Sequence, residues 1–461
     1  MMGVGSSVLP RGRDGALVAT AGLLAVAGGA AMAAAAYFVH PLALPLALAG
    51  VAFVAVAFVR PAWGLGGALL LVPLETANLP LPTGAVSPSE GALALVGLVW
   101  LVRLALRPET VVHPRVRDLP LLVVLVIVVA GVAIAVDPAP VLRVAALWTI
   151  FGFAYYQAQS LTSVEMRAVL TAFGVGVGIV GTLGAMRFVQ AGETALVAGG
   201  TLTNERAAAS VADPNYFAAL LVIGLLPALA LLIGDAKRNA WLLVPVAAAA
   251  AGVFLSLSRG ATLALAVGVL VLLAWRRARR VALALIALIV VLTFAGANPI
   301  VESDYVSTVE ERLSTVSDPT RQSRRPEIWS VAVDTAVENP FAGVGLNQFQ
   351  AVSARQSLFE EGAAIENAHN VYFSLAAETG FIALAAFLVF LGQLAARGVR
   401  AMRSRDRLNR MLTLGIMAAL VAFGVQGLTV AQIRVPLLVG AAMVLAGMLT
   451  RLADDEEAER A

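Results

Sequence analysis

The sequence of 461 residues contains no cysteine. Disulfide bonds, thiolate catalysis and cysteine metal sites are therefore excluded. Lysine occurs once, at Lys237, so nearly all of the positive charge is arginine. These basic residues are scattered between apolar runs, a distribution that gives no indication of nucleic-acid binding.

Charge is also scarce: 13% of the residues are charged and 60% are hydrophobic. A water-soluble protein of this length could not cover its surface with so few charges, so the sequence predicts a polytopic membrane protein.

The first apolar run follows Arg11 and Arg13 and extends to about residue 38 without a clear cleavage signal. We expect it to be retained as a helix.

Long apolar runs predict an all-α fold of about fourteen transmembrane helices, with about twelve as the alternative, because a span needs about 20 apolar residues. The third run and the ninth and tenth are short. The runs begin near residues 16, 41, 62, 89, 119, 142, 167, 213, 240, 260, 281, 370, 411 and 436.

The arginine distribution predicts the orientation. Three arginine-rich segments, 107–118, 275–280 and 397–410, fall on one side when the spans alternate, and the positive-inside rule makes that side cytoplasmic. Both termini are then cytoplasmic, the C-terminus as an acidic tail. The predicted organisation is residues 1–296 as helices 1–11, residues 297–368 as an extracytoplasmic loop subdomain, and residues 369–461 as helices 12–14 with the tail.

The long outer segment contains an amphipathic pattern. Pro326 suits the first turn of a helix, and Asn339-Pro340 ends it. We expect this short helix to lie on the outer membrane face. Gly343 and Gly345 follow, which suits a tight return of the backbone toward the bilayer.

The positive-inside rule does not explain the arginines that are predicted to lie on the outer side. Arg324 and Arg325 precede the helix that Pro326 opens, where the helix dipole disfavours a cation by roughly 0.3 to 1 kcal/mol. An anion would resolve this, since guanidinium groups and free backbone N–H groups together bind phosphate or diphosphate. The alternative is a surface network with Glu310, Glu311 or Glu327.

Two further arginines share the outer layer. Arg206 lies just before a helix that Asp213 can cap, and it is either a second anion contact or half of an ion pair with Glu205. Arg259 has apolar flanks on both sides, a setting that costs at least about 2.5 to 3.5 kcal/mol. Gly260 beside it suggests a sharp bend between two short helices. Snorkelling to the headgroups is the alternative.

His369 begins an apolar helix in the same layer. An imidazole with a pKa near 6.5 suits proton abstraction from a hydroxyl, although a cap or interfacial role is the common one. Asn370 could orient the ring or a sugar. Tyr372 could stack on a glycan with Phe373, but an interfacial position in lipid is preferred. Glu378 is expected to be buried and paired with an arginine.

The sequence contains no Walker loop for nucleotide binding and no helix with the paired histidines of a zinc site. Glu302 and Asp304 could hold a divalent ion, but a solvated loop is the preferred interpretation. We expect no metal and no cofactor.

The residues in this layer resemble a known family. The segments "DPNYFA" (213–218), "SRG" (258–260), "RRPEIWSVAVDTAVENPFAGVGLNQF" (324–349) and "AHNVYFSLAAETGFIAL" (368–384) occur in the order found in the bacterial O-antigen ligase and polymerase superfamily. The resemblance covers about residues 200 to 385. The chain carries two more predicted spans than a twelve-span ligase, so ligase and polymerase both stay open.

The resemblance implies a GT-C-type glycosyltransferase of the bacterial inner membrane, inverting and metal-independent. It would transfer a glycan from an undecaprenyl (polyprenyl) diphosphate carrier to an acceptor on the extracytoplasmic side. His369 matches the functional histidine, and Arg206 with Arg324 or Arg325 matches the phosphate-binding arginines. A transporter or flippase is the main alternative, and a metal-dependent transferase using Glu302 and Asp304 is another.

Overall fold

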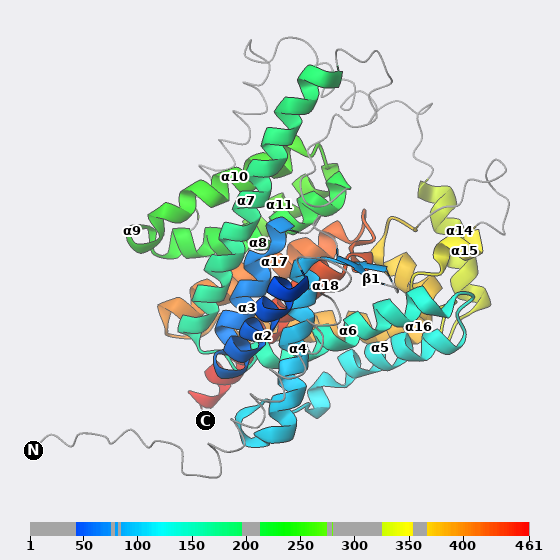
Figure 1. Cartoon of the computed structure of the whole chain (residues 1–461), viewed down its shortest axis with the longest axis horizontal. Helices are drawn as coiled ribbons and strands as arrows, with labels where there is room; N and C mark the ends of the chain where they lie inside the picture. Colours follow the sequence, from blue (N-terminus) through cyan, green and yellow to red (C-terminus); the bar gives the residue numbers. More distant parts are fainter. Residues whose placement is uncertain are drawn as a thin grey trace, which may run out of the picture.

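The computed structural model describes residues 43–74, 79–81, 84–195, 213–273, 279, 325–353 and 367–460 (Figure 1). The predicted spans near residues 16 and 281 lie outside these ranges. So do Arg206, Arg324, Glu302 and Asp304.

Helices make up most of the described chain. Those before the predicted outer loop are α2 (Ala43–Val59), α3 (Pro61–Leu70), α4 (Pro88–Leu106), α5 (Leu119–Ala130), α6 (Pro138–Ala158), α7 (Ser163–Ala195), α8 (Pro214–Gly234), α9 (Ala236–Asn239), α10 (Leu243–Leu255) and α11 (Arg259–Leu273). The later ones are α14 (Arg325–Glu338), α15 (Phe349–Ser353), α16 (Val371–Ala401), α17 (Arg407–Gln426) and α18 (Pro436–Ala458). One small hairpin departs from the predicted all-α fold: β1 (Leu79–Leu81) pairs antiparallel with β2 (Gly84–Val86).

Nine helical segments of the described chain are long and apolar enough to cross a membrane. They agree in order and position with the predicted spans near residues 89, 119, 142, 167, 213, 240, 370, 411 and 436. Two shorter apolar helices, Leu48–Val59 and Arg259–Leu273, and the ten-residue α3 correspond to the runs near 41, 260 and 62. The chain is therefore a polytopic helical membrane protein.

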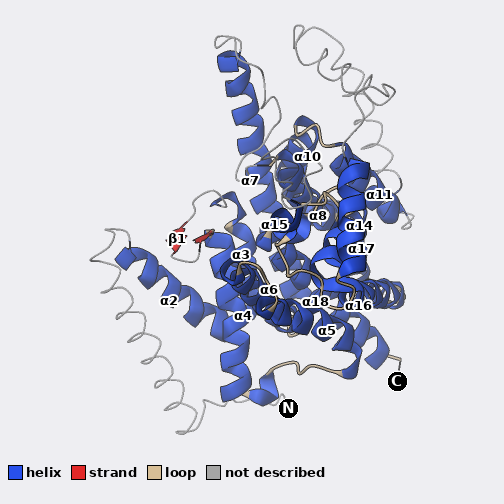
Figure 2. Cartoon of the chain, turned by 90° about the vertical axis from the view of Figure 1, so that its right-hand side faces the viewer, coloured by secondary structure: helices blue, strands red, loops and turns tan. Residues whose placement is uncertain are grey.

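Helix α8 is the centre of one half of the bundle (Figure 2). Its residues from Phe217 to Gly234 are all buried, and it packs against α7, α10, α11 and α17. Small residues allow these helices to approach closely; at Gly181 on α7 a Cβ atom would collide with the backbone of Ala248 on α10. In the other half, α16 and α18 pack together, α5 lies against α16 and α6 lies against α18.

Helix α16 is interrupted at Gly380, whose φ of 78° is not helical. The return loop, residues 340–345, fills the interruption. Its Pro340 carbonyl accepts a hydrogen bond of 2.8 Å from the N–H of Phe381, and the N–H of Val344 donates to the Ala377 carbonyl at 3.1 Å. The broken backbone is thus satisfied by protein, which is the condition for non-helical chain within a membrane domain.

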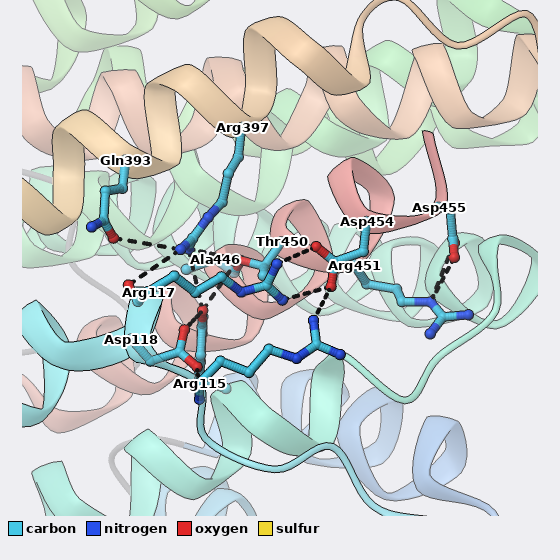
Figure 3. A network of polar contacts seen from close by, with 11 residues as sticks. Arg115, Arg117, Asp118, Gln393, Arg397, Ala446, Thr450, Arg451, Asp454 and Asp455 are labelled. Atoms are coloured by element: carbon cyan, nitrogen blue, oxygen red, sulfur yellow. Dashed lines mark hydrogen bonds and ion pairs between the residues drawn. The ribbon is translucent and has the colours of Figure 1, made fainter. Parts of the chain in front are cut away.

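A polar network ties down the opposite end of α16 (Figure 3). Arg115 and Arg117 both donate to the carboxylate of Asp454 on α18, at 2.9 Å and 2.6 Å. The buried Arg397 of α16 donates to Thr450 at 3.2 Å. Helices α16 and α18 and the segment before α5 are therefore joined on the side that the arginine pattern predicts to be cytoplasmic.

Candidate functional site

Four chain segments meet around His369. They are residues 367–370 before α16, the first turns of α14, the bend between α10 and α11, and the turn after α17. Figure 1 shows α14 and α15 together at one edge of the molecule. The site is thus assembled from segments up to about 170 residues apart in sequence, as expected for a bundle whose helices bring distant turns together.

The backbone of His369 is held in an unusual conformation. Its φ is 48°, in the left-handed region that costs an L-residue roughly 1 to 2 kcal/mol. Its N–H donates to Oδ1 of Asn367 at 2.8 Å, while its side chain is exposed. Both neighbours, Ala368 and Asn370, are buried. The left-handed residue therefore places the imidazole outside a well-packed segment, and such strain is typical of functional positions.

Trp329 on α14 reaches the same segment. Its Nε1 donates to the carbonyl of Ala368 at 2.9 Å, and its ring lies 5.4 Å from that of Phe373, centroid to centroid. Trp329 thereby fixes the peptide unit that immediately precedes His369. Arg325 lies four residues before Trp329, so both side chains project from the same face of α14.

Arg325 and Arg259 lie within electrostatic range of each other. Burial, and in second place the charge of Arg259, lowers the pKa of Arg325 below its ordinary value. Two like charges within electrostatic range disfavour the charged form of each group, and an anion bound near both would relieve this repulsion. The structure therefore brings together two of the four predicted diphosphate-binding arginines.

Arg259 begins α11 directly after the predicted bend. Leu257 in this bend has a φ of 52°, and Ser258 caps α11 by accepting a hydrogen bond from the N–H of Ala261. The sharp bend expected beside Gly260 is thus confirmed, although the residue with a positive φ is Leu257 and not Gly260. Within the described ranges the ion pairs involve other residues, and none includes Arg259.

The turn after α17 contacts both the segment that carries Arg259 and the segment that carries His369. A Cβ atom at Gly260 would collide with Oγ1 of Thr429, so the first turn of α11 packs directly on this turn. The preceding residue, Leu428, accepts a hydrogen bond from the side-chain amide of Asn370 at 3.1 Å. Arg259 and His369 are therefore carried by segments that both pack on residues 428–429.

The first turn of α8 belongs to the same layer. Asn215 accepts a hydrogen bond from Ser258 at 3.0 Å through its side chain and one from Gln426 at 3.2 Å through its carbonyl. Asp213 caps α8, as the sequence predicts, by accepting from the N–H groups of Asn215 and Tyr216. Arg206 itself lies outside the described residues, seven positions before Asp213.

Asn370 and Tyr372 are both occupied by structural contacts. Asn370 caps α16 through its Oδ1, which accepts from Tyr372 N–H at 2.9 Å and from Phe373 N–H at 3.1 Å. The Tyr372 hydroxyl donates to the Gly424 carbonyl at 2.9 Å. Tyr372 and Phe373 are both half-buried: the first contacts α17 and the second contacts Trp329. Their interfacial position in lipid stays a prediction.

Glu378 forms the ion pair that the sequence predicts. The carboxylate is completely buried, and its Oε1 lies 2.6 Å from a guanidinium nitrogen of Arg434, in the 3₁₀ turn Gln432–Arg434. The same oxygen accepts from the N–H of Phe349 at 3.1 Å. Glu378 therefore joins α16, α15 and the turn before α18, which is a structural role.

Sequence reasoning did not single out Arg434, Asn367 or Trp329. Arg434 carries the same signal as Arg259, an arginine between apolar residues, and could have been found by it. Trp329 and Asn367 give no such signal, because their contacts to the segment around His369 depend on how α14 packs against α16.

One comparison with known proteins gives a match. A family model described as O-antigen ligase matches residues 244–388, a range that contains Arg259, Arg325 and His369. The match confirms the resemblance to the O-antigen ligase and polymerase superfamily. No curated protein matches the chain.

Proposed function

We propose that this protein is a membrane glycosyltransferase of the O-antigen ligase or polymerase type. It moves a glycan from a polyprenyl diphosphate carrier to an acceptor hydroxyl on the extracytoplasmic side, with inversion and without a metal. The observation that carries the proposal is the approach of Arg259 and Arg325 beside the segment of His369.

The two arginines supply what a diphosphate leaving group requires. Negative charge grows on the diphosphate as the bond between the sugar and phosphate breaks, and fixed cations stabilise that charge in the transition state. Guanidinium groups suit this role because each binds phosphate oxygens through two parallel hydrogen bonds. Arg206 and Arg324 are proposed to complete the diphosphate site.

The imidazole of His369 is proposed to act on the acceptor. It accepts the proton of the acceptor hydroxyl as that oxygen attacks the anomeric carbon, and the electron pair of the broken bond leaves with the diphosphate. Attack from the face opposite the leaving group inverts the anomeric centre. Activity should therefore fall in acid, because a protonated ring cannot accept a proton.

The distribution of buried charge supports an enzyme over a transporter. A transporter with a central binding site needs ionisable residues near the middle of its spans. Buried charged side chains of the described chain lie instead toward helix ends: Glu90, Asp118, Glu378, Arg397 and Glu456.

A reconstituted assay with a polyprenyl-diphosphate glycan tests the proposal. We expect His369→Ala to lower turnover by about 100-fold or more while donor binding is retained, since general bases contribute about 10²–10⁴-fold. Arg259→Ala and Arg325→Ala should weaken donor binding and turnover together. Arg405→Ala, which removes an exposed arginine between α16 and α17, is the matched control and should behave like the native protein.

Two outcomes would overturn the proposal. Full turnover by His369→Ala would exclude the general base. Movement of the intact donor across the bilayer, with no bond broken, would identify the protein as a flippase.

A further inference from the structure

Helix α14 has three distinct faces. One is buried against α16 and α15 and consists of Ile328, Val331, Ala332, Thr335 and Ala336. A second is exposed and polar, with Glu327, Ser330, Asp334 and Glu338. The third is exposed but apolar. A helix whose exposed surface divides into apolar and acidic halves is typical of the boundary between lipid and water.

The apolar exposed face becomes more open along the helix. Val333 is 42% exposed, Val337 is 63% exposed and Phe341, just beyond the helix, is 73% exposed. The spacing of four residues places the first two on one line along the helix surface. We call Val333, Val337 and Phe341 the α14 apolar strip.

The strip ends where a second exposed apolar surface begins. On α16, Phe381 and Ile382 are the first exposed residues after Gly380. The surface continues along the helix through Ala385, Leu388, Val389 and Gly392, with no charged residue between 381 and 396. Since α16 is long and apolar enough to cross a membrane, this surface faces lipid chains.

The contact at Gly380 joins the two surfaces. Phe381 donates its N–H to the carbonyl of Pro340, the residue directly before Phe341. A Cβ atom at Gly380 would lie only 2.6 Å from the carbonyl carbon of Phe341, so the two backbones are in contact. Phe341 is therefore at the same depth as the first lipid-facing residues of α16.

We infer that the α14 apolar strip is a lipid-binding surface: the C-terminal half of α14 inserts into the outer leaflet, and Phe341 reaches the acyl chains. The acidic face stays in water, and Arg325, at the other end of α14, lies toward the headgroups. The occupant is bilayer lipid because the strip continues the lipid-facing surface of α16. The lipid contact itself does not depend on the reaction proposed above; only the choice of the outer leaflet shares its predicted orientation.

The absence of cysteine makes a direct test possible, because each introduced cysteine is the only one in the chain. Nitroxide labels are attached to Val337→Cys and Phe341→Cys, with Asp334→Cys and Glu338→Cys as matched positions on the acidic face. Leu388→Cys on α16 serves as the lipid reference. The full-length protein is placed in vesicles of phosphatidylethanolamine and phosphatidylglycerol, and collisions with oxygen and with a water-soluble nickel complex are measured.

We expect the ratio of oxygen to nickel collisions to exceed one at positions 337, 341 and 388 and to fall below one at 334 and 338. Frequent nickel collisions at 337 and 341 would mean that the strip faces water and would overturn the inference. Protection of both positions from both reagents would mean that a second copy or another protein covers the strip, which would overturn it equally.

Discussion

The position of the His369 imidazole depends on hydrogen bonds to the peptide unit before it. Trp329 holds the carbonyl of Ala368, and Asn367 holds the N–H of His369. Both hydrogen bonds thus fix the same peptide unit, the one between Ala368 and His369 that directly precedes the left-handed residue. Residues that act through such contacts position a general base, and an error of about 1 Å in its placement can lower turnover by about 100-fold.

Trp329→Phe isolates the contribution of one hydrogen bond. The phenyl ring retains the packing against Phe373 but cannot donate to Ala368. We expect turnover to fall roughly tenfold with little change in the KM for the donor, because the ring is displaced while the arginines remain. Steady-state kinetics of the reconstituted protein provides the measurement.

Trp241→Phe is the control for this substitution. Trp241 is exposed and lies in the turn before α10, on the predicted cytoplasmic side. If both variants lose activity equally, or if Trp329→Phe changes only the KM for the donor, Trp329 does not position His369.

The helices were largely predictable because their signals are local. Span length and caps such as Ser87 before Pro88 and Asp213 before Pro214 are contained in a few consecutive residues. The interruption of α16 was not predictable in this way. Gly380 lies within a continuous apolar run, and its backbone is opened by residues 340–345, which are distant in sequence.

Glycines at this interruption should not tolerate a side chain. Gly343 and Gly380 both have positive φ, and a Cβ atom at either would collide with the backbone of the opposing segment. We expect Gly343→Ala and Gly380→Ala each to destabilise the protein by about 2 kcal/mol or more, combining the left-handed cost with the collision. Thermal unfolding in detergent measures this effect.

Gly392 provides the comparison within the same helix. Nothing lies within 4 Å of a Cβ atom at this position, and its backbone is helical. Gly392→Ala should therefore stabilise the protein by about 0.5–1 kcal/mol. Equal unfolding temperatures for all three alanine variants would show that the return loop does not brace α16.

Across the whole molecule, the sequence indicates candidate site residues better than it indicates how they are brought together. Arg259 was singled out because a charge between apolar runs is costly, Arg325 because it lies at the positive end of a helix dipole, and His369 because an imidazole suits proton transfer. Their convergence could not be predicted, since it depends on the packing of α11, α14, α16 and the turn after α17. The pairing of Glu378 with an arginine was expected, but the partner Arg434 was identified only by the fold.

The orientation of the chain can be tested with two single cysteines. Ser330 is exposed on α14, and Arg405 is exposed between α16 and α17. We expect a membrane-impermeant maleimide to label Ser330→Cys in intact spheroplasts and Arg405→Cys only after permeabilisation, because the positive-inside rule places Arg405 in the cytoplasm. The reverse pattern would place the candidate site on the cytoplasmic side.

The positive φ of His369 sets the proposed catalytic role against thermal stability. Glycine adopts this backbone without steric cost, whereas histidine retains a penalty of roughly 1–2 kcal/mol. His369→Gly should therefore unfold at a higher temperature than His369→Ala, while both variants are inactive. Higher thermal stability together with lost turnover would show that the backbone at this position gives up stability for the proposed reaction.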